Sequence, residues 1–213
     1  MSGYLGDVAA LARKDLRLEL RARDTLPAML LFVLATLVVF HFALPADAGD
    51  DPAYGLLWVA LVFTSLLGLA RAWVPEREGG ALDGLVLAPI DRSAIWLGKA
   101  IASFAFLAAA EVVALPAFVL FFAPLDAHAL AGVVLASVGI CAVGSLVSAM
   151  AAASRGREVL LPLIFLPLAI PIVVGGVGAS ISAEPGKFLA FLGLYDLVFA
   201  ILSWAAFEYV VTE

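Results

Sequence analysis

The chain has 213 residues, of which 64% are hydrophobic and only 14% are charged. A soluble domain of this length is about half apolar and about a quarter charged, so one soluble core could not hide the apolar surface carried here. The formal net charge of −6 disfavours nucleic acid as a partner. The composition therefore favours a protein that lipid, rather than water, surrounds for most of its length.

Residues 4–23 predict an amphipathic helix that lies in the membrane interface. Apolar side chains recur with helical spacing opposite Arg13, Lys14, Arg17 and Arg21. The segment carries too many charges to cross a bilayer, so we expect residues 1–25 to form a cytoplasmic, interfacial unit. An exposed cytoplasmic tail is the alternative.

Six continuous apolar runs follow this segment. They cover residues 26–44, 53–74, 95–122, 129–153, 159–181 and 188–211. Each comes close to or exceeds the ~20 residues that cross a hydrocarbon core as a helix, and the first is too long for the apolar part of a signal peptide. The predicted fold class is therefore an all-α polytopic membrane protein, with residues 26–213 forming a domain of six transmembrane helices.

The basic residues predict the orientation of these spans. Eleven of the twelve Lys and Arg residues fall in the N-terminal segment or around the second and fourth connections, and only Lys187 falls elsewhere. Loops rich in Lys and Arg stay in the cytoplasm. We therefore expect a multi-pass protein of the cytoplasmic (inner) membrane with both termini in the cytoplasm.

The longest polar break lies in the cytoplasmic loop 75–94. Pro75 should end the second transmembrane helix, because proline cannot donate a backbone hydrogen bond. Glu76, Arg77 and Glu78 are then expected to enter water. A tight change of direction should follow at Gly79 and Gly80.

A short amphipathic helix is predicted next in this loop. Leu82, Leu85 and Val86 follow helical spacing, Asp83 lies on another face, and Pro89 closes the segment. Such a helix, tethered to two spans, would give a soluble partner a handle by which to move both. An ordinary interfacial loop is the alternative, so the ATPase-coupling role of these residues is a hypothesis.

Two carboxylates fall inside predicted spans. Glu111 lies near the middle of the third run and Asp196 lies in the sixth. A carboxylate at mid-membrane is disfavoured by ~2.5–3.5 kcal/mol, so it usually faces the bundle, a cavity or a partner. A buried, hydrogen-bonded carboxyl group is the structural interpretation, and contact with a partner helix or a polar point in a pathway is the functional one.

The fifth run is interrupted by Pro162, Pro167 and Pro171, and its outer end is rich in glycine. Each proline removes a backbone donor, which a membrane helix tolerates where neighbours satisfy the freed carbonyl groups. The pattern predicts a kink that acts as a hinge, a partly re-entrant outer segment, or a static bend.

The sequence carries no recognisable catalytic or metal-binding constellation. His41 and His128 are the only histidines, and ordinary surface residues are a simpler interpretation than axial haem ligands. Cys141 is expected to be a packing residue. The P-loop pattern G-x-x-x-x-G-K-[ST] does not occur, so ATP hydrolysis would belong to another chain.

Two segments resemble the CcmB (haem exporter protein B) family of cytochrome c maturation. Residues 76–90 read EREGGALDGLVLAPI and are similar to that family's cytoplasmic loop after the second helix. Residues 160–176 read LLPLIFLPLAIPIVVGG and are similar to its proline-punctuated helix. The basic N-terminal helix and the six spans also agree, so the resemblance covers essentially the whole chain.

The resemblance implies a non-enzymatic permease subunit of an ABC transporter complex, forming a homodimer with two copies of a separate ATPase. It also implies a haem-handling membrane protein and a haem chaperone as partners. Haem would be a substrate rather than a bound cofactor, ATP would bind the partner subunit, and the complex would either export haem or release the loaded chaperone. An ion-coupled secondary carrier and a non-transporting membrane scaffold are the alternatives.

Overall fold

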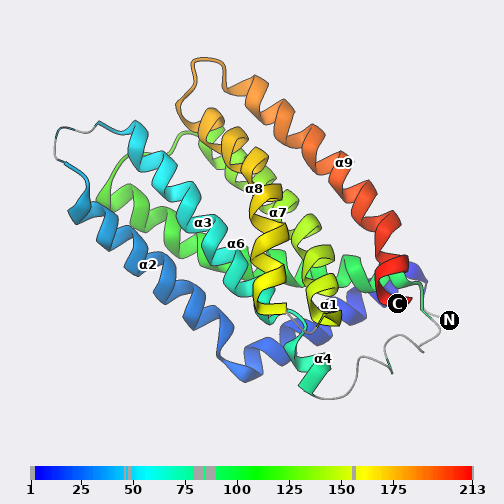
Figure 1. Cartoon of the computed structure of the whole chain (residues 1–213). Helices are drawn as coiled ribbons and strands as arrows, with labels where there is room; N and C mark the ends of the chain where they lie inside the picture. The colour runs from blue at the N-terminus through cyan, green and yellow to red at the C-terminus, as the bar shows by residue number, and fades with distance from the viewer. Residues whose placement is uncertain are drawn as a thin grey trace.

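The structure is a computed structural model that describes residues 3–45, 47, 49–78, 84, 90–154 and 157–212. Within these residues all regular secondary structure is helical (Figure 1). The helices are α1 Tyr4–Ala22, α2 Thr25–Ala43, α3 Asp51–Arg71, α4 Val74–Glu78, α6 Arg92–Phe121, α7 Ala127–Ala153, α8 Arg157–Ile181 and α9 Pro185–Thr212.

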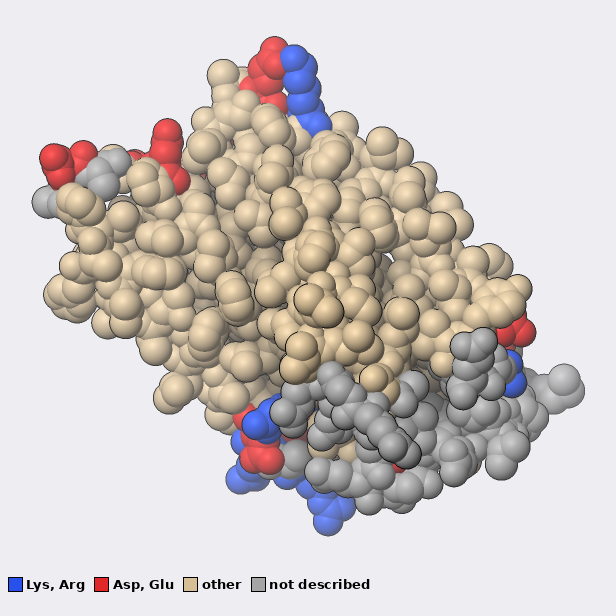
Figure 2. Space-filling view, in the orientation of Figure 1, with Lys and Arg blue, Asp and Glu red and all other residues tan. Residues whose placement is uncertain are grey.

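Six of the described helices are long and apolar enough to cross a membrane: α2, α3 (continued through α4 as far as Glu76), α6, α7, α8 and α9. Figure 2 shows acidic and basic side chains gathered at the two ends of the visible face, with a broad uncharged band between them. The prediction of an all-α protein with six transmembrane helices is confirmed, and the predicted spans agree with the helices to within a few residues.

The N-terminal helix α1 crosses one end of the bundle and packs along α6 (Figure 1). Val8 and Ala12 face inward and are buried. Gly98 of α6 allows the close approach, because a Cβ atom there would lie 2.9 Å from Cβ of Leu11. The predicted helix is therefore present, and its location in the membrane interface stays a prediction.

The second span ends differently from the prediction. α3 ends at Arg71, four residues before Pro75, and the five-residue α4 then begins at Val74. Pro75 thus occupies the first turn of α4, where its missing N–H group has no helical partner to lose. The expectation that Pro75 ends the second helix is wrong, since proline here begins a short new helix.

Capping residues fix where two of the spans begin. The Asp91 carboxylate accepts a hydrogen bond from the Ser93 N–H group at 2.8 Å, at the start of α6. The Asp126 carboxylate accepts one from the Ala129 N–H group at 2.7 Å, at the start of α7. The latter bond stabilises the charged form and lowers the pKa of Asp126.

Helix α7 lies at the centre of the bundle and contacts α6, α8 and α9.

A small residue allows α3 and α8 to approach each other closely. Trp58 of α3 is 1% exposed, and its indole fills the space beside Gly176 of α8 while its N–H group donates to Ser180 Oγ at 3.3 Å. The contact between α3 and α8 therefore has no room for a larger side chain at Gly176.

We predict that Gly176→Ala destabilises the protein, because the added Cβ would lie 2.4 Å from Cζ2 of Trp58. Overpacking of this kind typically costs about 1–3 kcal/mol, which would appear as a lower melting temperature of the purified protein in detergent. Gly193→Ala in α9 is the matched control, since its Cβ would meet nothing within 4 Å. Equal melting temperatures for the two variants would contradict this account of the α3–α8 contact.

Candidate coupling site at the base of the polar loop

Glu76, the first acidic residue of the predicted coupling loop, is 2% exposed. Its Oε1 atom accepts hydrogen bonds from Lys14 Nζ at 2.5 Å and from Lys99 Nζ at 2.8 Å. The expectation that Glu76 enters water is wrong, because two lysines from distant parts of the chain compensate its charge inside the protein.

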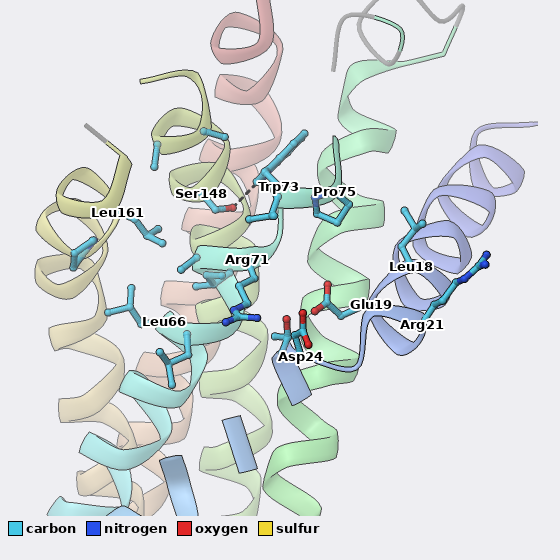
Figure 3. Close-up of a pocket in the computed structure, with 18 residues that line it drawn as sticks. Leu18, Glu19, Arg21, Asp24, Leu66, Arg71, Trp73, Pro75, Ser148 and Leu161 are labelled. Atoms are coloured by element: carbon cyan, nitrogen blue, oxygen red, sulfur yellow. Dashed lines mark hydrogen bonds between the residues drawn. The ribbon is translucent and has the colours of Figure 1, made fainter. Parts of the chain in front are cut away.

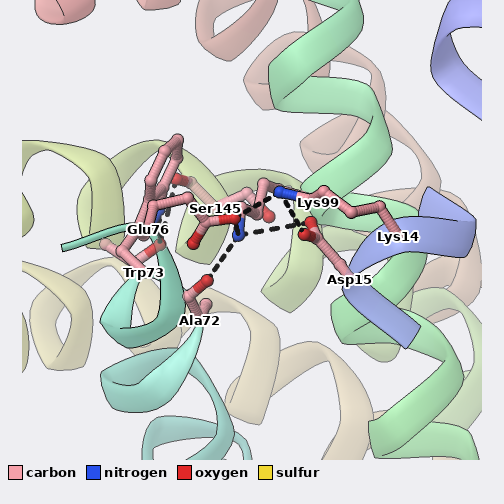
Figure 4. Close-up of polar contacts among 8 residues, drawn as sticks. Lys14, Asp15, Ala72, Trp73, Glu76, Lys99 and Ser145 are labelled. Atoms are coloured by element: carbon pink, nitrogen blue, oxygen red, sulfur yellow. Dashed lines mark hydrogen bonds and ion pairs between the residues drawn. The ribbon is translucent and has the colours of Figure 1, made fainter. Parts of the chain in front are cut away.

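Asp15 completes a four-residue ion cluster with Lys14, Glu76 and Lys99 (Figure 4). Its carboxylate lies 2.8 Å from Lys14 Nζ and 3.2 Å from Lys99 Nζ. The cluster holds two positive and two negative groups, so its formal charge is zero. This balance matters because a buried charge without a partner is strongly destabilising.

The cluster joins three elements of the fold. Lys14 and Asp15 come from α1, Glu76 comes from α4, and Lys99 comes from the second turn of α6. A displacement of α4 therefore acts directly on both α1 and α6.

Lys99 also holds the turn that separates α3 from α4. Its Nζ atom donates to the main-chain carbonyl of Ala72 at 2.6 Å and lies 4.7 Å from the centre of a Trp73 ring. Trp73 in turn donates to Ser148 Oγ of α7 at 3.2 Å and stacks on Phe207 of α9. The base of the polar loop is thus connected to α7 and α9 as well.

The two α1 members of the cluster have shifted pKa values. Burial raises the pKa of Asp15, although the neighbouring lysines oppose the shift. Burial acts to lower the pKa of Lys14, but hydrogen bonds to Asp15 and Glu76 outweigh it and raise the pKa. Lys14 therefore contributes stability below its ordinary pKa of 10.5 and loses that contribution only as the pH rises through its higher folded-state value.

The other predicted coupling residues are only partly covered by the structure. Arg77 and Glu78 are the last residues of α4, and Gly84 is helical. The remaining predicted residues lie outside the described residues: Gly79, Gly80, Leu82, Asp83, Leu85 and Pro89. Their coupling role stays a prediction.

The two carboxylates within the spans are both buried and both face α7. Glu111 accepts a hydrogen bond from Ser137 Oγ at 2.5 Å. Neither carboxylate oxygen of Asp196 has a hydrogen-bond partner among the described residues. The backbone of Gly139 leaves the space that Asp196 occupies, because a Cβ there would lie 2.3 Å from Oδ1. The bundle interior therefore holds both groups, and only Glu111 is hydrogen-bonded as the structural interpretation expects.

The proline-rich helix α8 runs without interruption from Arg157 to Ile181, with Pro162, Pro167 and Pro171 inside it. The partly re-entrant outer segment considered above is therefore wrong. Tyr195 Oη donates to the main-chain carbonyl of Leu168 at 2.7 Å, between the second and third prolines. Helix α9 thus supplies a hydrogen bond to the proline-rich stretch, while a kink or hinge at the prolines stays a prediction.

Among the described residues, no three His, Cys, Asp or Glu side chains could together hold a metal ion. His41 contacts the rings of Phe42, Phe121 and Phe122, and His128 lies 3.3 Å from Asp126. Cys141 is buried.

Of the four cluster residues, only Glu76 was predicted as a site residue; Lys14, Asp15 and Lys99 were not. Lys99 was assigned to the loop side of the third run, although it lies within residues 95–122. A lysine inside an apolar run usually has a partner, so this signal was present in the sequence. Its partners could not be identified, because they lie 84 and 23 positions away along the chain.

We predict that Lys99→Met lowers the free energy of unfolding by roughly 3–5 kcal/mol, because it leaves two buried carboxylates with one lysine. Adding Glu76→Gln restores a neutral cluster. The double variant should therefore lose less unfolding free energy than the sum of the losses in the two single variants. The measurement is a double-mutant cycle of unfolding in mixed detergent. Arg13→Met, an exposed position of α1, is the control and should change stability little. If the effects of Lys99→Met and Glu76→Gln on the free energy of unfolding simply add, the charges of the cluster do not stabilise one another.

Comparison with known proteins places the chain in a family. The family model described as "CcmB protein" matches residues 7–209, which contain all four members of the ion cluster. "Heme exporter protein B" of Rhodobacter capsulatus is 32% identical over 172 residues, covering 78% of this chain and 79% of that protein.

Two further relatives carry the same name. "Heme exporter protein B" of Bradyrhizobium diazoefficiens is 28% identical over 213 residues, covering 93% of this chain and 96% of that protein. Its counterpart in Pseudomonas aeruginosa is 30% identical over 182 residues, covering 83% and 81%. With six membrane-spanning helices and a family match over nearly its whole length, the chain belongs to the CcmB protein family.

Proposed function

We propose that this chain is the membrane permease subunit of an ABC transporter complex that exports haem or releases a haem-loaded chaperone during cytochrome c biogenesis. The relatives' name, "Heme exporter protein B", supports haem as the substrate. The ion cluster around Glu76 supports the coupling role, because it connects the start of the polar loop to the rest of the bundle.

In this coupling the chain transmits movement, and the chemistry of ATP hydrolysis takes place on another chain. A separate ATPase subunit grips the loop that includes Leu82 and Leu85. Movement of the loop pulls on α4, and Glu76 transfers the pull to Lys14 of α1 and to Lys99 of α6. Since Lys99 also holds the turn after α3, both spans that flank the loop move together.

The orientation follows from the placement of charge. The ion cluster joins α1, α4 and the start of α6, which meet at one end of the bundle (Figure 1). Lys and Arg gather at this end, and the connection at residues 45–50 is acidic. By the positive-inside rule the loop and both termini face the cytoplasm, in the cytoplasmic (inner) membrane.

The remaining parts of the complex are separate chains. Two copies of this permease pair with two copies of a soluble ATPase, and a haem-handling membrane protein and a haem chaperone complete the assembly. A non-transporting scaffold would dock the same partners without ATP-dependent activity.

We predict that a cysteine placed at Ser182, between α8 and α9, reacts with a membrane-impermeant maleimide in intact cells, whereas one placed at Gly84 reacts only after lysis. The native Cys141 is 3% exposed and should contribute little background. Labelling of the Gly84→Cys variant from outside would invert the topology and remove the basis for ATPase coupling.

We also predict that Leu82→Asp and Leu85→Asp each reduce co-purification of the ATPase and ATP-dependent activity of the reconstituted complex by at least about tenfold, because each replaces an apolar anchor of the interface with a charge. Val159→Asp is the control, since Val159 is 68% exposed at the first turn of α8. Normal ATPase binding with lost activity would show that these leucines transmit movement without anchoring the ATPase, and full activity would refute their coupling role.

A further inference from the structure

A pocket of about 960 Å³ opens at the end of the bundle that carries the ion cluster (Figure 3). Its walls come from the end of α1, the start of α2, the last turns of α3, from α4, and from the ends of α7 and α8 that lie there. This volume can hold part of a sizeable organic ligand.

One side of the pocket carries four charged side chains: Glu19, Arg21, Asp24 and Arg71. Within the part of the chain that the structure describes, none of the four forms an ion pair. Figure 3 shows the Arg21 guanidinium directed away from the other three, so the charges that lie together are two carboxylates and the Arg71 guanidinium. Figure 3 shows Arg71 on the same side as Glu19 and Asp24, with Leu161 and Leu66 away from them.

Thr25 adds a polar group at the same place. It lines the pocket, is 4% exposed, and its Oγ1 atom has no hydrogen-bond partner among the described residues. A buried hydroxyl group without a hydrogen-bond partner destabilises the protein, and a ligand that bonds to it removes this cost.

The other side of the pocket is apolar. Leu66, Leu69, Leu161 and Pro162 form it. Leu67 also lines the pocket and is 38% exposed on the face of a membrane-spanning helix. The apolar wall therefore continues toward the surface that acyl chains cover, so the ligand should be an amphiphile whose head binds the charged side.

The charges select among amphiphiles. An anionic head would meet two carboxylates, and a cationic head would meet Arg71, whereas a zwitterion pairs its phosphate with arginine and its ammonium with carboxylate. A primary ammonium group can donate hydrogen bonds to Glu19 or Asp24, and a trimethylammonium group cannot. Choline is usually held by aromatic faces, but Trp73 already contacts Lys99 and Phe207.

We propose that this pocket binds a phospholipid with a zwitterionic, primary-ammonium headgroup, namely phosphatidylethanolamine of the leaflet in which α1 lies. Its phosphate contacts Arg71, its ammonium group contacts Asp24 and Glu19, and an acyl chain runs along the α3–α8 wall. The bound lipid joins the turn between α1 and α2 to the ends of α3 and α8.

The test uses the full-length permease, purified, delipidated and mixed with phosphatidylethanolamine, phosphatidylcholine or phosphatidylglycerol. Native mass spectrometry counts the retained lipid, and the melting temperature reports the stabilisation. We expect phosphatidylethanolamine to be retained at least about fivefold better than either competitor. Arg71→Gln and Asp24→Asn should each remove this preference, while Arg13→Gln, an exposed arginine of α1 outside the pocket, should keep it.

Each other outcome overturns the proposal. Equal retention of the three lipids, or an unchanged preference in both pocket variants, would show that the headgroup is not recognised there. Displacement of the lipid by ferric haem would assign the pocket to an anionic amphiphile. Lipid binding is measured on the permease alone, so its failure leaves the proposed coupling function untouched.

Discussion

The buried charge of Lys99 is the constraint on which this end of the molecule depends. The lysine is 4% exposed near the start of the 30-residue, mostly apolar helix α6, where water cannot solvate it. Its compensation requires two carboxylates from separate elements, Asp15 of α1 and Glu76 of α4. A second lysine, Lys14, then balances the acids. The packing of α1 along α6 and the break between α3 and α4 both satisfy this requirement.

The same arrangement distinguishes the two ends of the bundle. At the end of the ion cluster, charged groups are buried and connect elements to one another. At the opposite end, Asp126 caps α7 and is exposed, and Glu184 pairs with Lys187 at the surface. Surface pairs contribute little to stability. Among the described residues, the buried ion pairs that join separate helices therefore lie at the end of the bundle that holds α4.

The spans were predictable because lipid imposes a length and a continuous apolar character on each helix, and both are visible in the sequence. A helix start near the beginning of α7 was also predictable, since aspartate, here Asp126, is a favoured capping residue. The environment of Glu76 was not, because its partners are 62 and 23 residues away and only the packing of α1 brings them together. The fit of Asp196 against Gly139 was not predictable for the same reason, because the sequence does not show which side chain fills the space beside a glycine. The coupling role of the loop residues from Gly79 to Pro89 remains a prediction. The pocket charges could not be grouped from the sequence, because they come from α1, the turn before α2 and the end of α3.

The ion cluster also imposes an order on biosynthesis. Lys14 and Asp15 leave the ribosome first and must wait until more than eighty further residues have been made before Lys99 reaches them. A product begun at the internal Met29 would lack both and would present Lys99 to the insertion machinery with Glu76 as its only acidic neighbour. An ionisable group inside a membrane span usually needs a partner, so the shorter product should be less stable than the full chain.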